Sequence, residues 1–324
     1  MKILVVRFSS IGDIVLTSAV VREIKSQIPK SEIHFLTKEV FKSLVADNPN
    51  IDHIHTIQNS IKEVVADLKK ENFDWIIDLH KNVRTKSLKT KLNKKSSSFR
   101  KLNYQKWKMV KFKKNDLPKL HIVDRYFEAV KPIGVVNPGI KGDFYIHKNN
   151  QVTLSTISEH LKSQEYVVMA IGAQFSTKRL PISKCVELLS KIQSPVVIIG
   201  GEMDVEFANE IVEQSKGTVI NSCGKFNIQQ SASVVEQSKC LITNDTGMMH
   251  IGACFSVSIV SIWGSTIPDF GMYPYRPNQE DTYSMHEVLD LSCRPCSKLG
   301  HQDCPKGHFK CMMNQDTERI AAEI

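Results

Sequence analysis

The chain has 324 residues, about twice the length of a typical domain, and therefore predicts two domains that each bury their own core. Hydrophobic residues (41%) and charged residues (24%) occur in ordinary globular proportions, which excludes collagen-like and disordered classes, and no apolar run approaches the roughly 18 residues of a membrane helix. The net charge of +9 predicts a polyanionic partner. Arg7 leaves the N-terminal apolar stretch too short for a secretory signal, so the eight cysteines predict a protein of the reducing cytoplasm.

The first part of the chain alternates strand-like and helix-like segments. Apolar runs of strand length, rich in β-branched residues, cover 2–8, 32–37, 53–57 and 74–79. Segments with helical apolar periodicity cover 14–28, 40–46 and 61–70. Strands that alternate with helices predict a parallel sheet with helices on both faces.

A strongly basic block follows at residues 81–119. It contains 15 Lys or Arg residues and a single acid, Asp116, so its net charge is +14 and the rest of the chain carries −5. Such a concentration of charge predicts contact with nucleic acid, an anionic membrane face or a phosphorylated glycolipid. The alternative is a solvated helical face that is merely rich in Lys.

The alternation resumes after a helix near 122–130 and a linker rich in Pro and Gly at 131–151. We therefore predict domains at 1–150 and 151–324. Strands of the second domain are expected at 166–171, 195–199, 218–220, 241–243 and 257–262. Its helices are expected at 154–161, 182–192, 205–214, 228–237, 247–255 and near 317–324.

Ligands of open α/β sheets bind beyond the carboxyl ends of the strands, which directs attention to the loops after strands. The first such loop, SSIGD, lacks the GxGxxG spacing of a dinucleotide site, so a nicotinamide cofactor is disfavoured. Asp13 in this loop begins a helix. It is interpreted either as a capping acid or as a general base.

Two loops of the second domain carry groups that suit a nucleotide. In GAQFSTKRLP, the hydroxyls of Ser176 and Thr177 and the cation of Lys178 precede a helix, which suits a phosphate, although a solvated lysine is the alternative. In GGEMD, Glu202 follows an apolar strand, where an acid can accept hydrogen bonds from a ribose diol.

The last of these loops, NDTGMMHIGA, opens another helix. Asp245, Thr246 and Gly247 lie at its start, where free backbone amides and the helix dipole favour an anion. His250 lies on the same side of the helix as Thr246. Together with the Lys178 loop, this segment predicts a pocket for a nucleoside diphosphate.

In their order and spacing, these four loops and the first helix resemble glycosyltransferase family nine, the heptosyltransferases of lipopolysaccharide core assembly. The resemblance implies an α/β fold of the GT-B type, with two Rossmann-like parallel-sheet domains facing across a cleft. By that resemblance, residues 1–150 bind the acceptor and residues 151–324 bind the nucleotide sugar. It further implies inverting transfer of heptose from ADP-heptose to an inner-core acceptor.

The resemblance also implies roles for individual residues, with Asp13 as the catalytic base, Lys178 on the diphosphate and Glu202 on the ribose. Acceptor-binding residues would be Ser10, Gly12, Lys81 and Arg84. Donor-binding residues would be Ser176, Thr177, Lys178, Glu202, Asp245, Thr246, Gly247 and His250. No DxD pair occurs, so we expect no cofactor and no requirement for a divalent metal. The expected partner is a lipid-linked anionic saccharide at the cytoplasmic face of the inner membrane, not nucleic acid.

A cysteine-rich loop near the end of the chain allows two interpretations. Cys293, Cys296, Cys304 and Cys311 lie within 19 residues, so they either hold zinc tetrahedrally or remain free thiols in a structured loop. An alternative function follows from the first interpretation, namely a nucleic-acid-binding protein. It would use a zinc knuckle here and the basic block with Tyr104, Trp107 and Phe112 as stacking groups. That function, and that of a nucleotide-sugar epimerase, explain the predicted donor and acceptor loops less well.

Overall fold

The computed structural model describes residues 1–161 and 165–324, and these residues form two compact units. The first unit comprises Met1–Lys101 and Leu120–Tyr145, and the second comprises Leu102–Lys119 and Ile146–Ile324. The boundary predicted near residue 150 assigns Leu102–Lys119 to the first domain, whereas this segment belongs to the second unit. Its Lys113 Nζ donates to the Pro295 carbonyl (2.7 Å), and its Asn115 Nδ2 donates to Asp269 (2.5 Å).

The first unit is built on a five-stranded parallel sheet in the order β3-β2-β1-β4-β5. The strands are β1 (Lys2–Val6), β2 (Glu32–Lys38), β3 (His53–Ile57), β4 (Trp75–Asp78) and β5 (Ser96–Ser98). Central parallel strands are covered on both faces and therefore read as continuous apolar runs. Ile3, Leu4, Val5 and Val6 of β1 accordingly have no exposed surface.

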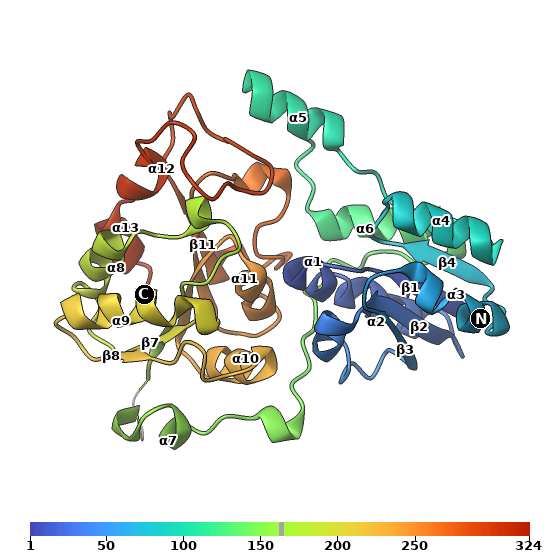
Figure 1. Ribbon diagram of the computed structural model, residues 1–324, viewed down its shortest axis with the longest axis horizontal. Helices are drawn as coiled ribbons and strands as arrows, with labels where there is room; N and C mark the ends of the chain where they lie inside the picture. The colour runs from blue at the N-terminus through green and yellow to red at the C-terminus, as the bar shows by residue number, and fades with distance from the viewer. Residues whose placement is uncertain (162–164) are drawn as a thin grey trace. The chain divides into compact units, whose positions relative to one another are not determined.

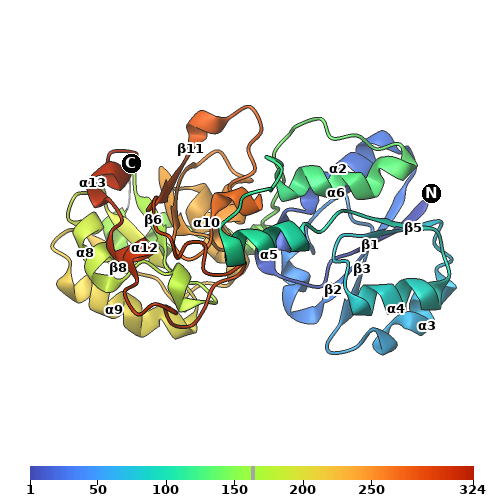
Figure 2. The same cartoon turned by 90° about the horizontal axis from the view of Figure 1, so that it is seen from above.

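Helices cover both faces of this sheet (Figure 2). α2 (Ser18–Gln27) and α6 (Ile122–Val130) lie on one side, and α3 (Val65–Lys70) and α4 (Val83–Leu92) lie on the other, while the short α1 (Ile11–Val15) follows β1. The helix predicted over 40–46 is a 3-10 helix at Glu39–Leu44, and the one over 61–70 begins with a 3-10 turn at Ile61–Glu63.

The second unit contains a six-stranded parallel sheet in the order β11-β10-β9-β6-β7-β8. Its strands are β6 (Val167–Ala170), β7 (Val196–Ile199), β8 (Val219–Asn221), β9 (Cys240–Asn244), β10 (Ser258–Trp263) and β11 (Tyr283–Glu287). The sequence analysis did not predict β11, because this edge strand reads YSMHE and is mostly half-buried. It therefore lacks the apolar run that reveals a central strand.

Helices also cover both faces of the second sheet, with α8 (Ile182–Leu189) and α9 (Val205–Gln214) on one side and α10 (Ile228–Glu236) and α11 (Gly247–Gly252) on the other (Figure 1). The apolar core under α8 and α9 also takes residues from α12 (Lys310–Met313) and α13 (Thr317–Ala321). The remaining helices are α5 (Asn103–Phe112) and α7 (Leu154–Ile157).

The predicted α/β class with two parallel-sheet domains is confirmed, because every strand pair in both sheets runs parallel. In such sheets the loops after neighbouring strands gather at one edge, which brings together residues that are distant in sequence. Among residues 1–161 and 165–324, no helix combines the length and apolarity needed to cross a bilayer.

Candidate functional site

At the carboxyl edge of the first sheet, Arg7 joins two strand-end loops. β1 and β4 are neighbours, with Val6 paired with Asp78, so the loops that follow them begin side by side. The Arg7 side chain is buried there. Its Nη1 donates to the Leu79 carbonyl (2.5 Å) and its Nε donates to the Ser9 carbonyl (2.7 Å). The guanidinium therefore fixes the backbone of both loops.

Arg7 also holds the carboxylate of Asp13, the predicted base. Arg7 Nη2 lies 2.6 Å from Asp13 Oδ1, and the Tyr126 hydroxyl donates to the same oxygen at 3.4 Å. The other oxygen, Oδ2, accepts from the Ser10 hydroxyl at 2.8 Å. Burial raises the pKa of Tyr126, with a further contribution from Asp13, so this hydroxyl stays protonated and remains a donor.

Both interpretations of Asp13 are compatible with this geometry. Ser10 and Asp13 form a capping box at the start of α1, within which Gly12 is buried. The Asp13 side chain nevertheless keeps 23% of its surface exposed at the strand edge. A carboxylate that is oriented by a cation and still reachable from solvent is suitable for accepting a proton.

The other two predicted acceptor residues follow β4, with Lys81 in the loop and Arg84 in the first turn of α4. The backbone NH of Lys81 donates to Asp78 Oδ1 (2.6 Å), and its Nζ donates to the Phe99 carbonyl (2.7 Å). The Arg84 guanidinium lies over the Phe8 ring, 5.4 Å from its centroid. Lys81 therefore lies in the loop after β4, and Arg84 extends from α4 to the Phe8 ring that follows β1. Contact of either cation with an acceptor stays a prediction.

The sequence analysis missed Arg7, Tyr126 and His80 in this site. Burial, together with the nearby positive charge of Arg7, lowers the pKa of His80 to about 4, so the imidazole is neutral at physiological pH. Its ring packs edge-on against Phe8, with centroids 5.1 Å apart. The sequence feature that could have revealed this site is Arg7, because a cation that directly follows a buried strand needs a partner of opposite charge or a hydrogen-bond acceptor.

In the second unit, Lys178 and Asp245 are in direct contact. Lys178 Nζ lies 2.6 Å from Asp245 Oδ2 and donates to the Asp245 carbonyl at 3.1 Å. The Thr266 hydroxyl also donates to Asp245 Oδ2, at 2.7 Å. These residues follow β6, β9 and β10, which are neighbours in the sheet. The sheet thus joins two of the predicted donor-binding residues.

The two hydroxyl residues before Lys178 differ in their surroundings. Thr177 is 2% exposed, and its hydroxyl lies 2.9 Å from both Ser265 Oγ and the His301 carbonyl. It therefore links the Lys178 loop to the cysteine-rich loop. Ser176 is exposed, with its hydroxyl 3.3 Å from Gln302 Oε1. Of the pair, Ser176 is the one that a ligand reaches without rearrangement.

The loop after β7 depends on Asp204, which the sequence analysis did not single out. Its Oδ2 accepts from the Gly201 backbone NH at 2.9 Å, and its Oδ1 lies 3.0 Å from Arg179 Nη2. Asp204 thereby joins the loops after β6 and β7. Glu202, the predicted ribose acid, is exposed in this loop, in a 3-10 turn at Glu202–Asp204.

The predicted anion site at the start of α11 is partly open. Thr246 is the N-cap residue and Gly247 the first helical residue, and both are half-buried. His250, one turn further along, is only 3% exposed. The roles of Thr246, Gly247 and His250 in binding a ligand stay predictions. Contact with His250 would require the ligand to reach a buried ring.

None of the four cysteines of the loop at 293–311 forms a disulfide, and Cys311 is buried in the core while the other three are half-buried. Burial raises the pKa of Cys311 to about 11, and the other three thiols contribute in the same direction. Among the described residues, the potential metal ligands that lie within 4.8 Å of one another belong instead to Glu32, His34 and His53, each of which offers one ligand atom. Zinc binding by the cysteines stays a prediction.

This chain is similar to known proteins over most of its length. The family model described as glycosyltransferase family 9 (heptosyltransferase) matches residues 61–300. Lipopolysaccharide heptosyltransferase 1 of Campylobacter coli is 22% identical over 240 residues, which cover 66% of this chain and 68% of that protein.

Two solved structures share the fold over nearly the whole chain. The family 9 glycosyltransferase of Veillonella parvula has a TM-score of 0.78 and 23% identity, and covers 99% of this chain and 96% of its own. The ADP-heptose lipopolysaccharide heptosyltransferase II of E. coli has a TM-score of 0.76 and 16% identity, and the match covers 100% of this chain and 97% of the E. coli chain. The predicted GT-B fold is therefore confirmed, and the chain belongs to glycosyltransferase family 9, the heptosyltransferase family.

Proposed function

We propose that this family 9 transferase moves a heptose from ADP-heptose to an anionic inner-core acceptor of lipopolysaccharide, with inversion at the anomeric carbon. The observation that carries the proposal is the Asp13 carboxylate, which Arg7 orients at a strand edge while leaving it partly exposed. The names of the similar heptosyltransferases support the choice of donor and acceptor. We propose that the reaction requires no cofactor and no divalent metal.

In the proposed mechanism, Asp13 is the general base. Its Oδ1 is held by Arg7 and Tyr126, so the proton of the acceptor hydroxyl goes to Oδ2, which accepts hydrogen bonds from the Ser10 hydroxyl and the Ser10 backbone NH. The acceptor oxygen forms a bond to the anomeric carbon as the bond from that carbon to the diphosphate breaks. ADP leaves from the opposite face, which inverts the configuration.

Lys178 is proposed to stabilise the negative charge that develops on the departing ADP. Its ammonium group is already directed toward the start of α11 by Asp245, where the Thr246 and Gly247 amides favour an anion. A phosphate oxygen would then add to or replace the Asp245 contact. Glu202, exposed after β7, is proposed to accept hydrogen bonds from the ribose, and Ser176 to reach a phosphate.

We further propose that the enzyme works at the cytoplasmic face of the inner membrane as a peripheral protein. The basic block at 81–119 supports this, because a lipid-linked acceptor lies in an anionic surface. Nucleic acid is the rival partner for the same charge. Binding assays with labelled ADP-heptose and with RNA distinguish the two, since only the transferase is expected to retain the sugar nucleotide.

The decisive experiment is product analysis with ADP-heptose and truncated lipopolysaccharide acceptors, using wild type, Asp13→Asn and the control Asp281→Asn, an exposed acid of the second unit. Asp13→Asn should lower kcat by about 10² to 10⁴, the contribution of a positioned base, without changing ADP affinity. Near-normal turnover in this variant would exclude Asp13 as the base. Retention of configuration in the product would exclude the single displacement.

A further inference from the structure

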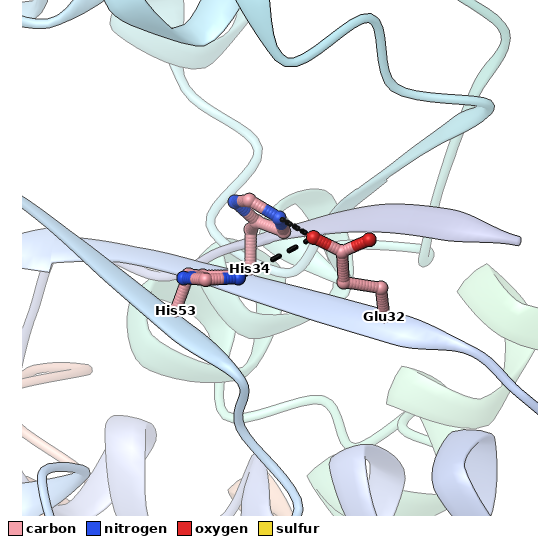
Figure 3. A group of neighbouring side chains, drawn as sticks. All are labelled: Glu32, His34 and His53. Carbon is pink, nitrogen blue, oxygen red and sulfur yellow. Dashed lines mark hydrogen bonds and ion pairs between the residues drawn. The ribbon is translucent and has the colours of Figure 1, made fainter.

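A second group of chemically active side chains lies at the opposite edge of the first sheet from Asp13. Glu32 and His34 lie two residues apart on β2, and His53, the first residue of β3, pairs with His34 in the parallel register. All three are near the amino ends of their strands. Their side chains lie on one face of the sheet, and both imidazoles point toward the Glu32 carboxylate (Figure 3).

The ligand atoms have separations typical of a metal site. Glu32 Oε1 lies 3.0 Å from His34 Nε2 and 3.3 Å from His53 Nε2, and all three atoms lie within 4.8 Å of one another. Zinc bound to His nitrogen at about 2.0–2.1 Å and to carboxylate oxygen at about 2.0–2.2 Å requires ligand atoms about 3.3 Å apart in a tetrahedron. Small side-chain rotations would therefore bring the three atoms around one ion.

His34 is held in place by its surroundings. It is 1% exposed, its ring packs edge-on against Phe73, and its Nδ1 lies 2.8 Å from His55 Nε2. In a metal-binding histidine, the ring nitrogen that does not bind the metal characteristically donates a hydrogen bond to a neighbouring group, which fixes the ring orientation and its tautomer. In the His34 tautomer that places the proton on Nδ1, toward His55, the lone pair of Nε2 faces Glu32 Oε1, and a cation between these two atoms would stabilise that tautomer.

The local charge also favours a divalent cation. Glu71 Oε2 lies 4.0 Å from His34 Nε2, so two carboxylates face this imidazole. Lys2 is the nearby cation. Its Nζ lies 2.9 Å from Glu71 and 3.3 Å from Glu32, so Lys2 can remain paired with Glu71 when an ion occupies the position beside Glu32. With neutral imidazoles, the two acids and one lysine leave a net negative charge for the ion to balance.

We propose that Glu32 Oε1, His34 Nε2 and His53 Nε2 bind one divalent transition-metal ion of the zinc class, with water completing a tetrahedron. Two imidazoles and one carboxylate select Zn²⁺, Co²⁺ or Ni²⁺ over Mg²⁺ and Ca²⁺, which prefer oxygen ligands alone. The ion would link the edge strand β3 to β2. Because these residues lie at the amino edge, the site is structural and takes no part in the transfer reaction.

The test is a Co²⁺ titration of untagged, chelator-treated protein, followed by visible spectroscopy and calorimetry. The cysteine loop is a competing site, so the titration uses the Cys293→Ser/Cys296→Ser background. We expect one equivalent of Co²⁺ with the absorption of a tetrahedral ion and without thiolate charge transfer. Zn²⁺ should displace the Co²⁺ and raise the thermal midpoint of the same protein.

Two variants locate the site. His53→Gln alters a side chain that is 55% exposed, so the fold should persist. It should weaken Co²⁺ binding at least 10–100-fold, because replacing even a residue that only hydrogen-bonds to a metal ligand lowers metal affinity by that factor. The matched control is His147→Gln, in the second unit, which should bind Co²⁺ as the background does. Absence of Co²⁺ binding by the background, or unchanged binding by His53→Gln, would overturn the proposal.

Discussion

Individual residues in the candidate site act through charged neighbours that the sequence does not reveal. Lys178 and Asp245 are 67 positions apart in the chain, yet their side chains are in contact because β6 and β9 are neighbours in the sheet. The sequence identified both residues from their loops, but it could not show that the lysine is neutralised by the aspartate before ADP arrives. The same limit applied to Arg7 and Asp13, whose pairing depends on how α1 turns back after β1.

Replacing Lys178 tests the proposed phosphate contact. Lys178→Ala should weaken ADP binding by about 1.5–3 kcal/mol, the contribution of a hydrogen bond to a charged group. The loss should lie near the upper end of this range, because the Asp245 carboxylate is then left facing the diphosphate without its cation. Calorimetric titration of ADP measures the difference.

The control for this prediction is Lys184→Ala, which removes a lysine of α8 that pairs with Glu187. It should leave ADP affinity unchanged. Asp245→Asn should reduce affinity less than Lys178→Ala does, because it removes a repulsive charge along with the positioning contact. Equal ADP affinity in Lys178→Ala and wild type would remove Lys178 from the binding site.

At the scale of elements, the apolar pattern located those that are buried on a continuous face. The helices at 122–130 and 205–214 match their predicted ranges, because each carries a regular apolar stripe. The pattern failed for β11 and for α5, which has no buried residue. Elements that cover little apolar surface have no periodic signal, so only their tertiary contacts reveal them.

The loop after β7 contains a packing constraint that the sequence signalled only as two adjacent glycines. A Cβ on Gly200 would lie 2.9 Å from Asp204 Oδ2 and from Cys223 Sγ, whereas a Cβ on Gly201 would meet its nearest neighbour at 3.8 Å. Contacts under 3 Å force the surrounding atoms to move. The first of two adjacent glycines is therefore required by packing, and the second is not.

Alanine substitutions at these two positions should consequently differ in stability. Gly200→Ala should reduce the free energy of unfolding by about 1–3 kcal/mol, the usual cost of overpacking a well-packed site. Gly201→Ala should stay within about 0.5 kcal/mol of wild type. Urea unfolding followed by circular dichroism gives both values, and coincident unfolding curves for the two variants would contradict the prediction.

At the scale of the whole molecule, the basic block is shared between the two units. Nine of its Lys and Arg residues belong to the first unit and six to the second, where α5 also exposes Tyr104, Trp107 and Phe112. Lys111 lies over the rings of Trp107 and Phe112, at 5.5 and 5.6 Å. Aromatic rings interleaved with lysines are typical of segments that contact a membrane interface. The sequence predicted the charge, but the exposure of the aromatic groups came from the structure.

This surface leads to a prediction for lipid binding. The protein should cosediment with anionic vesicles and not with zwitterionic ones, and binding should fall steeply with salt. Each Lys or Arg near an anionic surface contributes about 1 kcal/mol, and charges are screened over about 8 Å at physiological ionic strength. Exposed lysines of the block that are suitable for reversal to Glu are Lys86, Lys91, Lys95 and Lys114.

The quadruple variant should raise the apparent KM for a lipid-linked acceptor and leave the KM for ADP-heptose unchanged, because only the acceptor is bound to the membrane. Its matched control carries the same charge reversal at exposed lysines outside the block, Lys30, Lys42, Lys62 and Lys69. If net charge alone governed binding, both variants would lose vesicle affinity equally. Loss of vesicle affinity in the block variant alone would place the membrane contact at residues 81–119. A normal KM of that variant for the lipid-linked acceptor would instead show that the block is only a solvated surface.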